Sequence, residues 1–400
     1  MPRASGANST GQAEFIEVIA MSGSPRTLCV LPNLPERRTG GGILLFELLV
    51  YLRSRGAVAA IVPVPKHLEE EFQEVENDPL LDGIEWHTLV AQRTPGLRGY
   101  LERLLSPAPA EVAKFATESN RATLERARKE WRPTSELVVS SWALAAYQGL
   151  TLPAGVRLYM VNVDPDIVRY DGPSLKRKVA AYVDRPKVDR LCRKALSSAA
   201  RVGSISPVDV AVLNRMGHRG DVEYVPPLMR SQPLDRSGVE PNTVLITTNF
   251  TYSQNVTSLE WFFQECWPHV DPKARLTVTG KDEGGKLQAL CSSNPRTTYA
   301  GCLDAAGLDA AFARAAVAVN PTRLGSGFQI KLLDAIARGV PIVSTEFSNR
   351  IGPGIAASDD PLALAAIISQ RLTPGSVQSF DYGSFYRNAI AAWDRFLFET

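Results

Sequence analysis

The order strand, glycine turn, helix and strand occurs near the start of the chain and again in its second half, and it constrains the fold more than any other feature. The first copy runs from TLCVLPNL (27–34) through RRTGGG to the helical pattern of ILLFELLVYLRSRG (43–56) and the strand AVAAIVPV (57–64). Apolar strands that alternate with helices are typical of parallel sheets covered by helices. The sequence therefore predicts an α/β fold.

Further segments extend this alternation on both sides of a linker. ELVVSSW (136–142), VRLYMVNV (156–163) and ARVGSIS (200–206) are predicted strands of the first half. Proline and polar residues dominate PPLMRSQPLDRSGVEPNT (226–243), after which TVLITTNF begins a fresh series of strands and helices. We predict a mobile tail at residues 1–25, a first domain at 26–229, a linker at 230–242, a second domain at 243–378 and a final helix at 379–400. Two Rossmann-like domains of this kind would face each other across a cleft at the carboxyl ends of their strands.

Composition excludes several classes of protein. No run of about 18 apolar residues is present, so we expect no transmembrane span, and residues 1–25 lack the pattern of a signal peptide. The five cysteines are far apart without a CxxC pair and the four histidines are scattered, so we expect neither a disulfide framework nor a metal site. This cysteine usage fits a reducing cytosol, so we expect a cytoplasmic protein. At a net charge of only +2, we expect no nucleic-acid partner.

One segment departs from this balanced charge. Ten basic residues face three acidic ones between Arg169 and Arg201, including LKRKVAAYVDRPKVDRLCRK on a predicted helix over residues 173–198. An ordinary solvated helix face explains this run, and so does a surface for anionic lipid or an acidic acceptor. The second explanation would place the protein at the inner face of the membrane.

The stretch NPTRLGSGFQIKLLDAIARGVPIVST (320–345) carries the strongest candidate for a binding site. Gly325 and Gly327 allow tight turns and close approach of a ligand after a predicted strand, and the exposed amides at the start of the next helix suit a pyrophosphate. Lys331, Asp334 and Arg338 fall on one face of that helix. Lys331 could neutralise a phosphate and Asp334 could accept ribose hydroxyls. The alternative is a solvated face with one ion pair.

These segments resemble family 4 glycosyltransferases of the GT-B fold. DAIARGVPIVST matches the end of the family signature, YSQNVTSLEWFFQECWPHV resembles a helix of one branch of the family, and SISPVDVAVLNRMG with VEYVPP resembles the segment that closes its first domain. Together with RRTGGGILLFELLVYLRSRGAVAAIVPV, the resemblance covers most of residues 27–350 in the family order.

The resemblance implies a reaction. A sugar would move from a nucleoside diphosphate sugar, bound by the second domain, to an acceptor on the first domain, which could be a glycan, a lipid-linked sugar or a small molecule. Relatives of this kind retain anomeric configuration and stabilise the departing pyrophosphate with cations and helix amides. No divalent metal or other cofactor is then expected, and the final helix is expected to return to the first domain.

The chain also departs from the family pattern. The two paired glutamates of the family map to Ser326 and Asp334, and its usual Arg and Lys after the first strand of the second domain are missing. We expect Lys331 and Arg323 to replace those cations, with Lys331 as a catalytic candidate. The predicted donor-binding residues are Arg323, Gly325, Ser326, Gly327, Lys331 and Asp334.

The first half supplies two further candidates. Gly40, Gly41 and Gly42 would line the cleft opposite the donor, although a simple turn explains them equally well. Asp164 and Asp166 form a DPD tripeptide with the spacing of a metal-binding pair in the other glycosyltransferase fold. The intervening proline favours a loop without metal, and we predict Asp164 as an acceptor-side catalytic residue.

Two other functions remain open from sequence alone. The missing Glu, Arg and Lys also fit a GT-B relative that has lost catalysis and acts as a binding or scaffold protein. A sugar-nucleotide epimerase of the same fold would need acid and base residues around the cleft, and the sparse histidines weaken that alternative.

Overall fold

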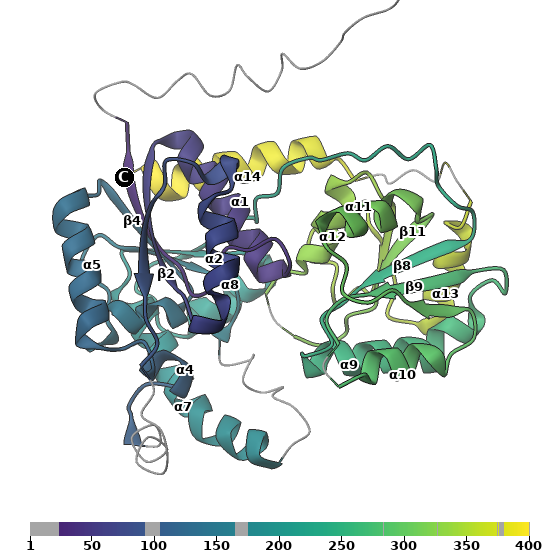
Figure 1. Cartoon of the computed structure of the whole chain (residues 1–400), viewed down its shortest axis with the longest axis horizontal. Helices are drawn as coiled ribbons and strands as arrows, with labels where there is room; N and C mark the ends of the chain where they lie inside the picture. Colours follow the sequence, from purple (N-terminus) through teal and green to yellow (C-terminus); the bar gives the residue numbers. More distant parts are fainter. Residues whose placement is uncertain are drawn as a thin grey trace, which may run out of the picture.

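The computed structural model describes residues 24–92, 105–164, 175–282, 284–325, 327–373, 375 and 380–399, and it contains two parallel sheets flanked by helices (Figure 1). The first sheet has the strand order β3-β2-β1-β4-β5-β6-β7 and the second has the order β10-β9-β8-β11-β12-β13. The predicted α/β fold with two parallel sheets is confirmed. Most of the predicted tail, residues 1–23, lies outside the described residues.

The strands of the first sheet are short and their central members are buried on both faces, as expected for a parallel sheet covered by helices. Every residue of β4 and four of the five in β1 are buried. The edge strand β3, with the sequence EWHTL, is only half-buried, which explains why its pattern does not predict it. The strands are β1 (Arg26–Val30), β2 (Ala57–Pro63), β3 (Glu85–Leu89), β4 (Ser135–Val139), β5 (Arg157–Met160), β6 (Arg201–Ser204) and β7 (Val222–Tyr224).

The three glycines predicted as a loop form the first turn of a helix instead. Thr39 caps α1 (Gly40–Arg55) by accepting a hydrogen bond from the amide of Gly42 at 3.2 Å, and this cap outweighs the low helix propensity of glycine. A side chain at Gly42 would overlap the carbonyl oxygen of Glu36. Glycine is therefore required there by close packing.

In the described part of the first half, other helices accompany α1. They are α2 (Glu69–Glu76), α4 (Ala110–Ala113), α5 (Glu118–Trp131), α7 (Leu175–Ser198) and α8 (Pro207–Arg215). The long helix α7 corresponds to the predicted basic helix, and Figure 1 shows it extending away from the body of the molecule. None of the helices in the described part of the chain has the length and apolar content that crossing a membrane requires.

The second sheet follows the predicted alternation after the linker. Its strands are β8 (Thr243–Thr247), β9 (Arg275–Thr279), β10 (Thr297–Tyr299), β11 (Val317–Asn320), β12 (Ile342–Ser344) and β13 (Ala356–Ala357). Its helices are α9 (Ser253–Trp261), α10 (Lys286–Ser292), α11 (Ala305–Arg314), α12 (Ile330–Ala337) and α13 (Pro361–Gln370). The sequence predicts one helix over NVTSLEWFFQECWPHV. In the structure α9 continues directly into a π-helical turn at Phe262–Cys266 and a 3-10 turn at Trp267–His269.

The last helix, α14 (Tyr382–Phe398), packs against the first sheet although it follows the second sheet in the chain (Figure 1). Trp393 is buried, its ring centre lies 4.5 Å from that of Tyr159, and its indole N–H donates to the carbonyl of Pro226 at 2.9 Å. Asp394 accepts hydrogen bonds from Tyr51 and Arg55, each at 2.8 Å. The chain therefore connects the two sheets twice, through residues 226–242 and through the segment before α14.

The strand orders locate the crevices of the two sheets. In each sheet the chain reverses its direction of strand addition once, between β1 and β4 in the first and between β8 and β11 in the second. Ligands of open parallel sheets bind beyond the carboxyl ends of the strands at this reversal. The segments after β1, β4, β8 and β11 are therefore the places where a binding site is expected.

Candidate functional site

The loop between β11 and α12 lies where the carboxyl ends of the two sheets meet. We call residues 321–325 and 327–329 the glycine loop. Gly325 and Gly327 have φ values of 123° and 73°, a region that strains other residues. A side chain at Gly327 would overlap Asn162 and come within 2.5 Å of the carbonyl oxygen of Val161, both just after β5 of the first sheet. Glycine is therefore required there by both backbone angle and space.

A second contact joins the halves beside this loop. A side-chain carbon at Gly40 would lie 3.5 Å from Ile330, the first residue of α12. Of the predicted cleft glycines, Gly40 thus faces the second half, Gly41 has open space around it and Gly42 packs against its own half.

An ion pair between the halves holds the glycine loop. Arg350, in the segment after β12, lies 3.2 Å from Asp209 in α8 of the first half, and the two side chains are only 8% and 5% exposed. The Arg350 guanidinium also donates to the carbonyls of Gly327 at 2.6 Å and Gly325 at 3.4 Å, while the amide of Gly327 donates to Asp209 at 2.9 Å. The Gly327 amide is consequently occupied and cannot bind a phosphate in this conformation.

Sequence reasoning did not find this pair. Asp209 lies in the first turn of a helix, where an acidic residue is ordinary, and Arg350 lies in a loop. The two residues are 141 positions apart, so no local pattern connects them.

Lys331 is the candidate cation of the site. Its ammonium donates to the hydroxyl of Thr322 at 3.2 Å, and no carboxylate among the described residues pairs with it. Burial lowers the pKa of Lys331 from 10.5 to about 8, because desolvation disfavours the charged form. A half-buried lysine without a carboxylate is poised to gain an anionic partner.

Hydrogen-bond donors without partners accompany this lysine. Within the described residues, the side-chain amide nitrogen of Asn320 is buried and unpaired, and the side-chain oxygen of Asn320 accepts from the Thr322 hydroxyl that Lys331 also contacts. The backbone amides of Phe328 and Gln329 likewise have no partner there. Gln329, the N-cap residue of α12, makes no side-chain capping hydrogen bond, and the first turn of α12 contains no acidic residue. Unpaired donors around a cation favour an anion at the start of α12.

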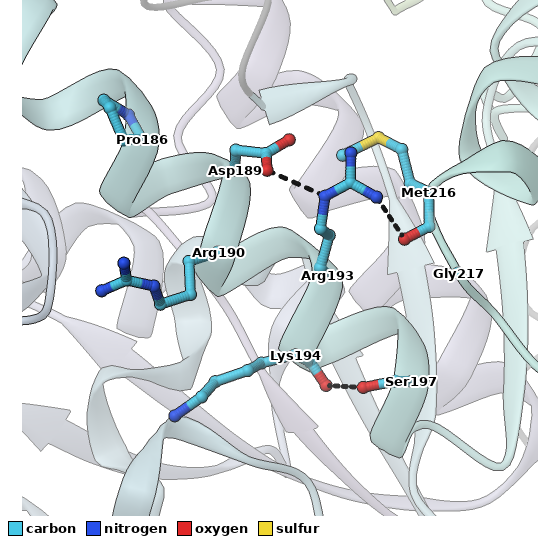
Figure 2. Close-up of a pocket in the computed structure, with 8 residues that line it drawn as sticks. All are labelled: Pro186, Asp189, Arg190, Arg193, Lys194, Ser197, Met216 and Gly217. Atoms are coloured by element: carbon cyan, nitrogen blue, oxygen red, sulfur yellow. Dashed lines mark hydrogen bonds and ion pairs between the residues drawn. The ribbon is translucent and has the colours of Figure 1, made fainter.

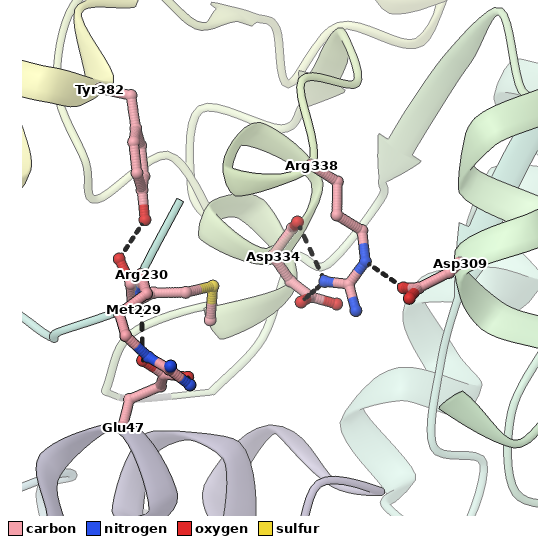
Figure 3. A network of polar contacts seen from close by, with 7 residues as sticks. All are labelled: Glu47, Met229, Arg230, Asp309, Asp334, Arg338 and Tyr382. Carbon is pink, nitrogen blue, oxygen red and sulfur yellow. Dashed lines mark hydrogen bonds and ion pairs between the residues drawn. The ribbon is translucent and has the colours of Figure 1, made fainter. Parts of the chain in front are cut away.

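Asp334 and Arg338 share one face of α12 as predicted, but that face is buried instead of solvated. They form an ion pair, and Arg338 also binds Asp309 of α11 at 2.8 Å (Figure 3). Burial raises the pKa of Asp334, and the neighbouring Arg338 partly opposes this shift. Nearby in Figure 3, Glu47 of α1 binds Arg230 of the linker at 2.8 Å, so α12 lies close to the junction of the two halves.

Arg323, Gly325 and Ser326 are the remaining predicted donor-site residues, and the described contacts of Arg323 and Gly325 do not direct them to the start of α12. Arg323 is exposed, and its guanidinium stacks 4.3 Å above the ring centre of Trp261 in α9. Gln254 of α9 lies about 4.0 Å from the space a side chain at Gly325 would fill. Ser326 lies outside the described residues.

Asp164 follows β5 and is completely buried. Its carboxylate accepts hydrogen bonds from the hydroxyls of Ser140 and Ser141 and from the amide of Ser141 at 3.2 Å. Burial raises the pKa of Asp164 to about 6, while these hydrogen bonds act in the opposite direction. Ser140 has φ 65° and ψ 150°, a strained conformation that costs about 1–3 kcal/mol. Asp164 therefore holds the strained segment after β4 and does not reach the surface.

Metal binding by the DPD tripeptide gains no support from this geometry. Asp166 lies outside the described residues, and Asp164 is enclosed by serines. Within the described part of the chain, no group of three or more His, Cys, Asp or Glu side chains is placed to hold a metal ion.

A basic cavity of about 460 Å³ lies apart from the glycine loop, between α7 and the turn after α8 (Figure 2). Arg190, Arg193 and Lys194 line it. Arg193 is already bonded to Asp189 at 2.8 Å and to the carbonyl of Met216 at 3.0 Å. Lys194 donates to the carbonyl of Gly149 at 3.4 Å, a longer contact than those of Arg193.

Comparison with known protein families finds a match in the second half of the chain. Residues 241–373 match the family model "Glycosyl transferases group 1", a range that includes the glycine loop and α12. No curated protein sequence matches the chain. The match and the glycosyltransferase structures below support the predicted enzyme class, a glycosyltransferase.

Solved structures share the fold of the whole chain. Sucrose-phosphate synthase from Thermosynechococcus elongatus has a TM-score of 0.63 at 18% identity, over 94% of this chain and 96% of that one. TarM of S. aureus, solved with fondaparinux, alpha-GlcNAc-glycerol and UDP, has a TM-score of 0.59 at 7% identity, over 93% and 96%. WaaG, a glycosyltransferase of lipopolysaccharide biosynthesis, has a TM-score of 0.55 at 12% identity, over 92% and 93%. At these identities the likeness confirms the GT-B fold and no more.

Proposed function

We propose that the chain is a family 4, retaining glycosyltransferase that moves a sugar from a nucleoside diphosphate sugar to an acceptor without a divalent metal. One observation carries the proposal. Within the matched domain, the glycine loop and the start of α12 place the half-buried Lys331 and several unpaired donors where the two sheets meet. The presence of UDP in the TarM structure supports a nucleoside diphosphate as the ligand.

In this reaction the site must stabilise the diphosphate that leaves the sugar. As the glycosidic bond to the donor phosphate breaks, negative charge grows on the diphosphate oxygens, and preorganised donors in a closed site lower the energy of that state. Lys331 supplies one positive charge. The free amides of Phe328 and Gln329 lie at the positive end of the α12 dipole and can donate to the diphosphate oxygens. Asp334 would accept ribose hydroxyls with the carboxylate oxygen that Arg338 leaves available.

The acceptor is assigned to the first half. In this proposal Asp164 acts through Ser140 and Ser141, because its own carboxylate is enclosed. Gly41 faces open space at the start of α1 and would let an acceptor approach that helix end. The acceptor in this proposal is a glycan, a lipid-linked sugar or a small molecule.

The experiment is a thermal-stability screen with UDP-, GDP-, ADP- and dTDP-sugars, followed by product analysis in the presence of EDTA. A ligand that binds only the folded chain raises its melting temperature. We expect one nucleotide family to stabilise the chain, activity to survive EDTA, and proton NMR to show the donor's anomeric configuration in the product. Inversion of that configuration, or loss of activity in EDTA that added metal restores, would refute those parts of the proposal.

The alternative is a GT-B relative that binds its ligand without catalysis, favoured by the replacement of the family glutamates by Ser326 and Asp334. Such a protein would be stabilised by a nucleotide sugar yet would neither hydrolyse nor transfer the sugar. Incubating the stabilising donor with the chain at high concentration and measuring release of the nucleoside diphosphate separates the two functions.

We also propose that the chain is cytoplasmic and touches an anionic membrane through α7. Four cysteines are buried as free thiols and the fifth, Cys302, is exposed and free, which suits a reducing compartment. Tyr182 of α7 is 83% exposed, and Arg185, Arg190 and Lys194 are exposed along the same helix. Sedimentation with phosphatidylglycerol vesicles tests this contact: binding should fall as salt increases and should weaken in R190E. Equal binding to neutral vesicles would argue against it.

A further inference from the structure

We propose that Asp209 and Arg350 form a clasp between the two halves that positions the glycine loop for the donor diphosphate. This inference rests on the proposed function, and it identifies two positioning residues that lie outside the family signature. Among the described residues, the clasp combines the ion pair itself, two Arg350 bonds to loop carbonyls, and the bond from the Gly327 amide to Asp209. Arg350 also donates to the hydroxyl of Ser206 at 3.5 Å.

The direction of these hydrogen bonds gives the clasp its effect. Arg350 draws the carbonyl oxygens of Gly325 and Gly327 toward itself. Carbonyl oxygens that faced the ligand would repel a diphosphate, and their capture by Arg350 removes that repulsion, while Asp209 occupies the amide of Gly327. Phe328 and Gln329, which follow directly, are the residues whose amides remain free within the described chain.

Because both side chains are buried, neither charge is stable in the interface without the other. Both side chains are less than a tenth exposed, and an unpaired charge in such a place is strongly unfavourable. Arg350 and Asp209 therefore remain in the interface only when both are present and the glycine loop occupies its place between them. Since Asp209 belongs to α8 and Arg350 to the segment after β12, the shape of the loop depends on contact between the halves.

The test measures amide hydrogen exchange of peptides covering residues 321–329 in the full chain without ligand. The variants are Arg350→Met, which removes the charge and keeps the length of the side chain, and Asp209→Asn. We expect exchange in this segment to rise at least about tenfold in both variants, because loop bonds that resist opening are lost. Peptides from β5 and α5 should exchange as in the wild type.

The matched control is Arg128→Met. Arg128 forms a comparably buried pair with Glu136 at 2.9 Å, with side chains 21% and 10% exposed, but within the first half only. Its loss should leave exchange at residues 321–329 unchanged. If both arginine variants lose the same stability and neither alters exchange of the glycine loop, the pair is merely structural and the proposal fails.

Titration of UDP, GDP, ADP and dTDP connects the clasp to binding. We expect Arg350→Met to weaken the tightest of these by about tenfold, within the usual range of coupling between sites, whereas Arg128→Met leaves its affinity unchanged. Unaltered affinity in Arg350→Met would overturn the positioning role. If no diphosphate binds the wild-type chain, the proposed function fails, while the exchange experiment still decides whether the clasp orders the loop.

Discussion

Raising the pH from 7 to 9 should weaken nucleoside diphosphate binding about tenfold, because Lys331 loses its proton over this range. Burial lowers its pKa to about 8, so about nine-tenths of the free protein carries the charge at pH 7 and about one-tenth at pH 9. A bound diphosphate favours the charged form and raises the pKa again. Binding must therefore take up a proton, and the affinity must fall as the pH rises through 8.

Calorimetry measures this directly. Titrations of UDP, GDP, ADP and dTDP in buffers with different ionisation enthalpies should show uptake of about half a proton at pH 8. Lys331→Arg keeps its charge throughout the range, so its affinity should be independent of pH between 7 and 9. Lys331→Met should bind weakly at every pH. A wild-type affinity that is constant from pH 7 to 9, or that rises, would refute the assignment of Lys331 to the diphosphate.

The same pKa predicts an effect on stability. At pH 7 Lys331 is charged in both the folded and unfolded states, and folding carries the full cost of burying that charge. The unfolded state holds its proton up to a higher pH, so the contribution of this residue to stability improves between about pH 8 and 10.5. The pKa difference corresponds to at most about 3 kcal/mol, of which solvent screening leaves about 1–2 kcal/mol. Lys331→Met should therefore unfold at higher urea concentration than the wild type at pH 7 while losing affinity.

Three further predictions concern other residues of the site. Gly327→Ala should destabilise the chain by about 2–4 kcal/mol in urea unfolding, whereas Gly339→Ala, with φ 72° and open space, should cost about 1 kcal/mol; equal losses would argue against the contact between halves. Asp164 retains its proton up to about pH 6 in the folded state, so its contribution to stability falls by about 2 kcal/mol from pH 4 to 6; Asp164→Asn should abolish this part of the pH dependence, and an unchanged profile would contradict the burial argument. Asp334→Ala should weaken the tightest nucleoside diphosphate about tenfold by calorimetry, while Asp309→Ala, which removes the other carboxylate of the Arg338 cluster, should not.

Apolar runs and the alternation of strands and helices in the sequence predict the buried strands of this fold and several of its helices. The strands β1, β2 and β4 are continuous apolar runs, and the alternation after the linker predicts β8, α9, β9, β11 and α12. The edge strand β3 is missed because its EWHTL sequence is half-buried and lacks a clear period. The glycines at 40–42 are taken for a loop because glycine normally disfavours helices, whereas the Thr39 cap and the space beside Glu36 decide their conformation.

The candidate site likewise has features that a sequence pattern predicts and features that depend on tertiary packing. The spacing of Lys331, Asp334 and Arg338 on one helix face follows from helical periodicity, but periodicity does not reveal whether that face meets water or protein. Burial of the Asp334–Arg338 pair and the lowered pKa of Lys331 depend on packing around α12. The clasp of Asp209 and Arg350 depends on docking of two halves, which no local sequence pattern encodes.

A crystal structure of the chain with its tightest nucleoside diphosphate tests the central claim most directly. We predict that the diphosphate lies at the start of α12, with an oxygen within about 3.2 Å of the Lys331 ammonium and others facing the amides of Phe328 and Gln329. A diphosphate bound in the basic cavity beside Arg190 and Lys194, with the glycine loop empty, would contradict the account.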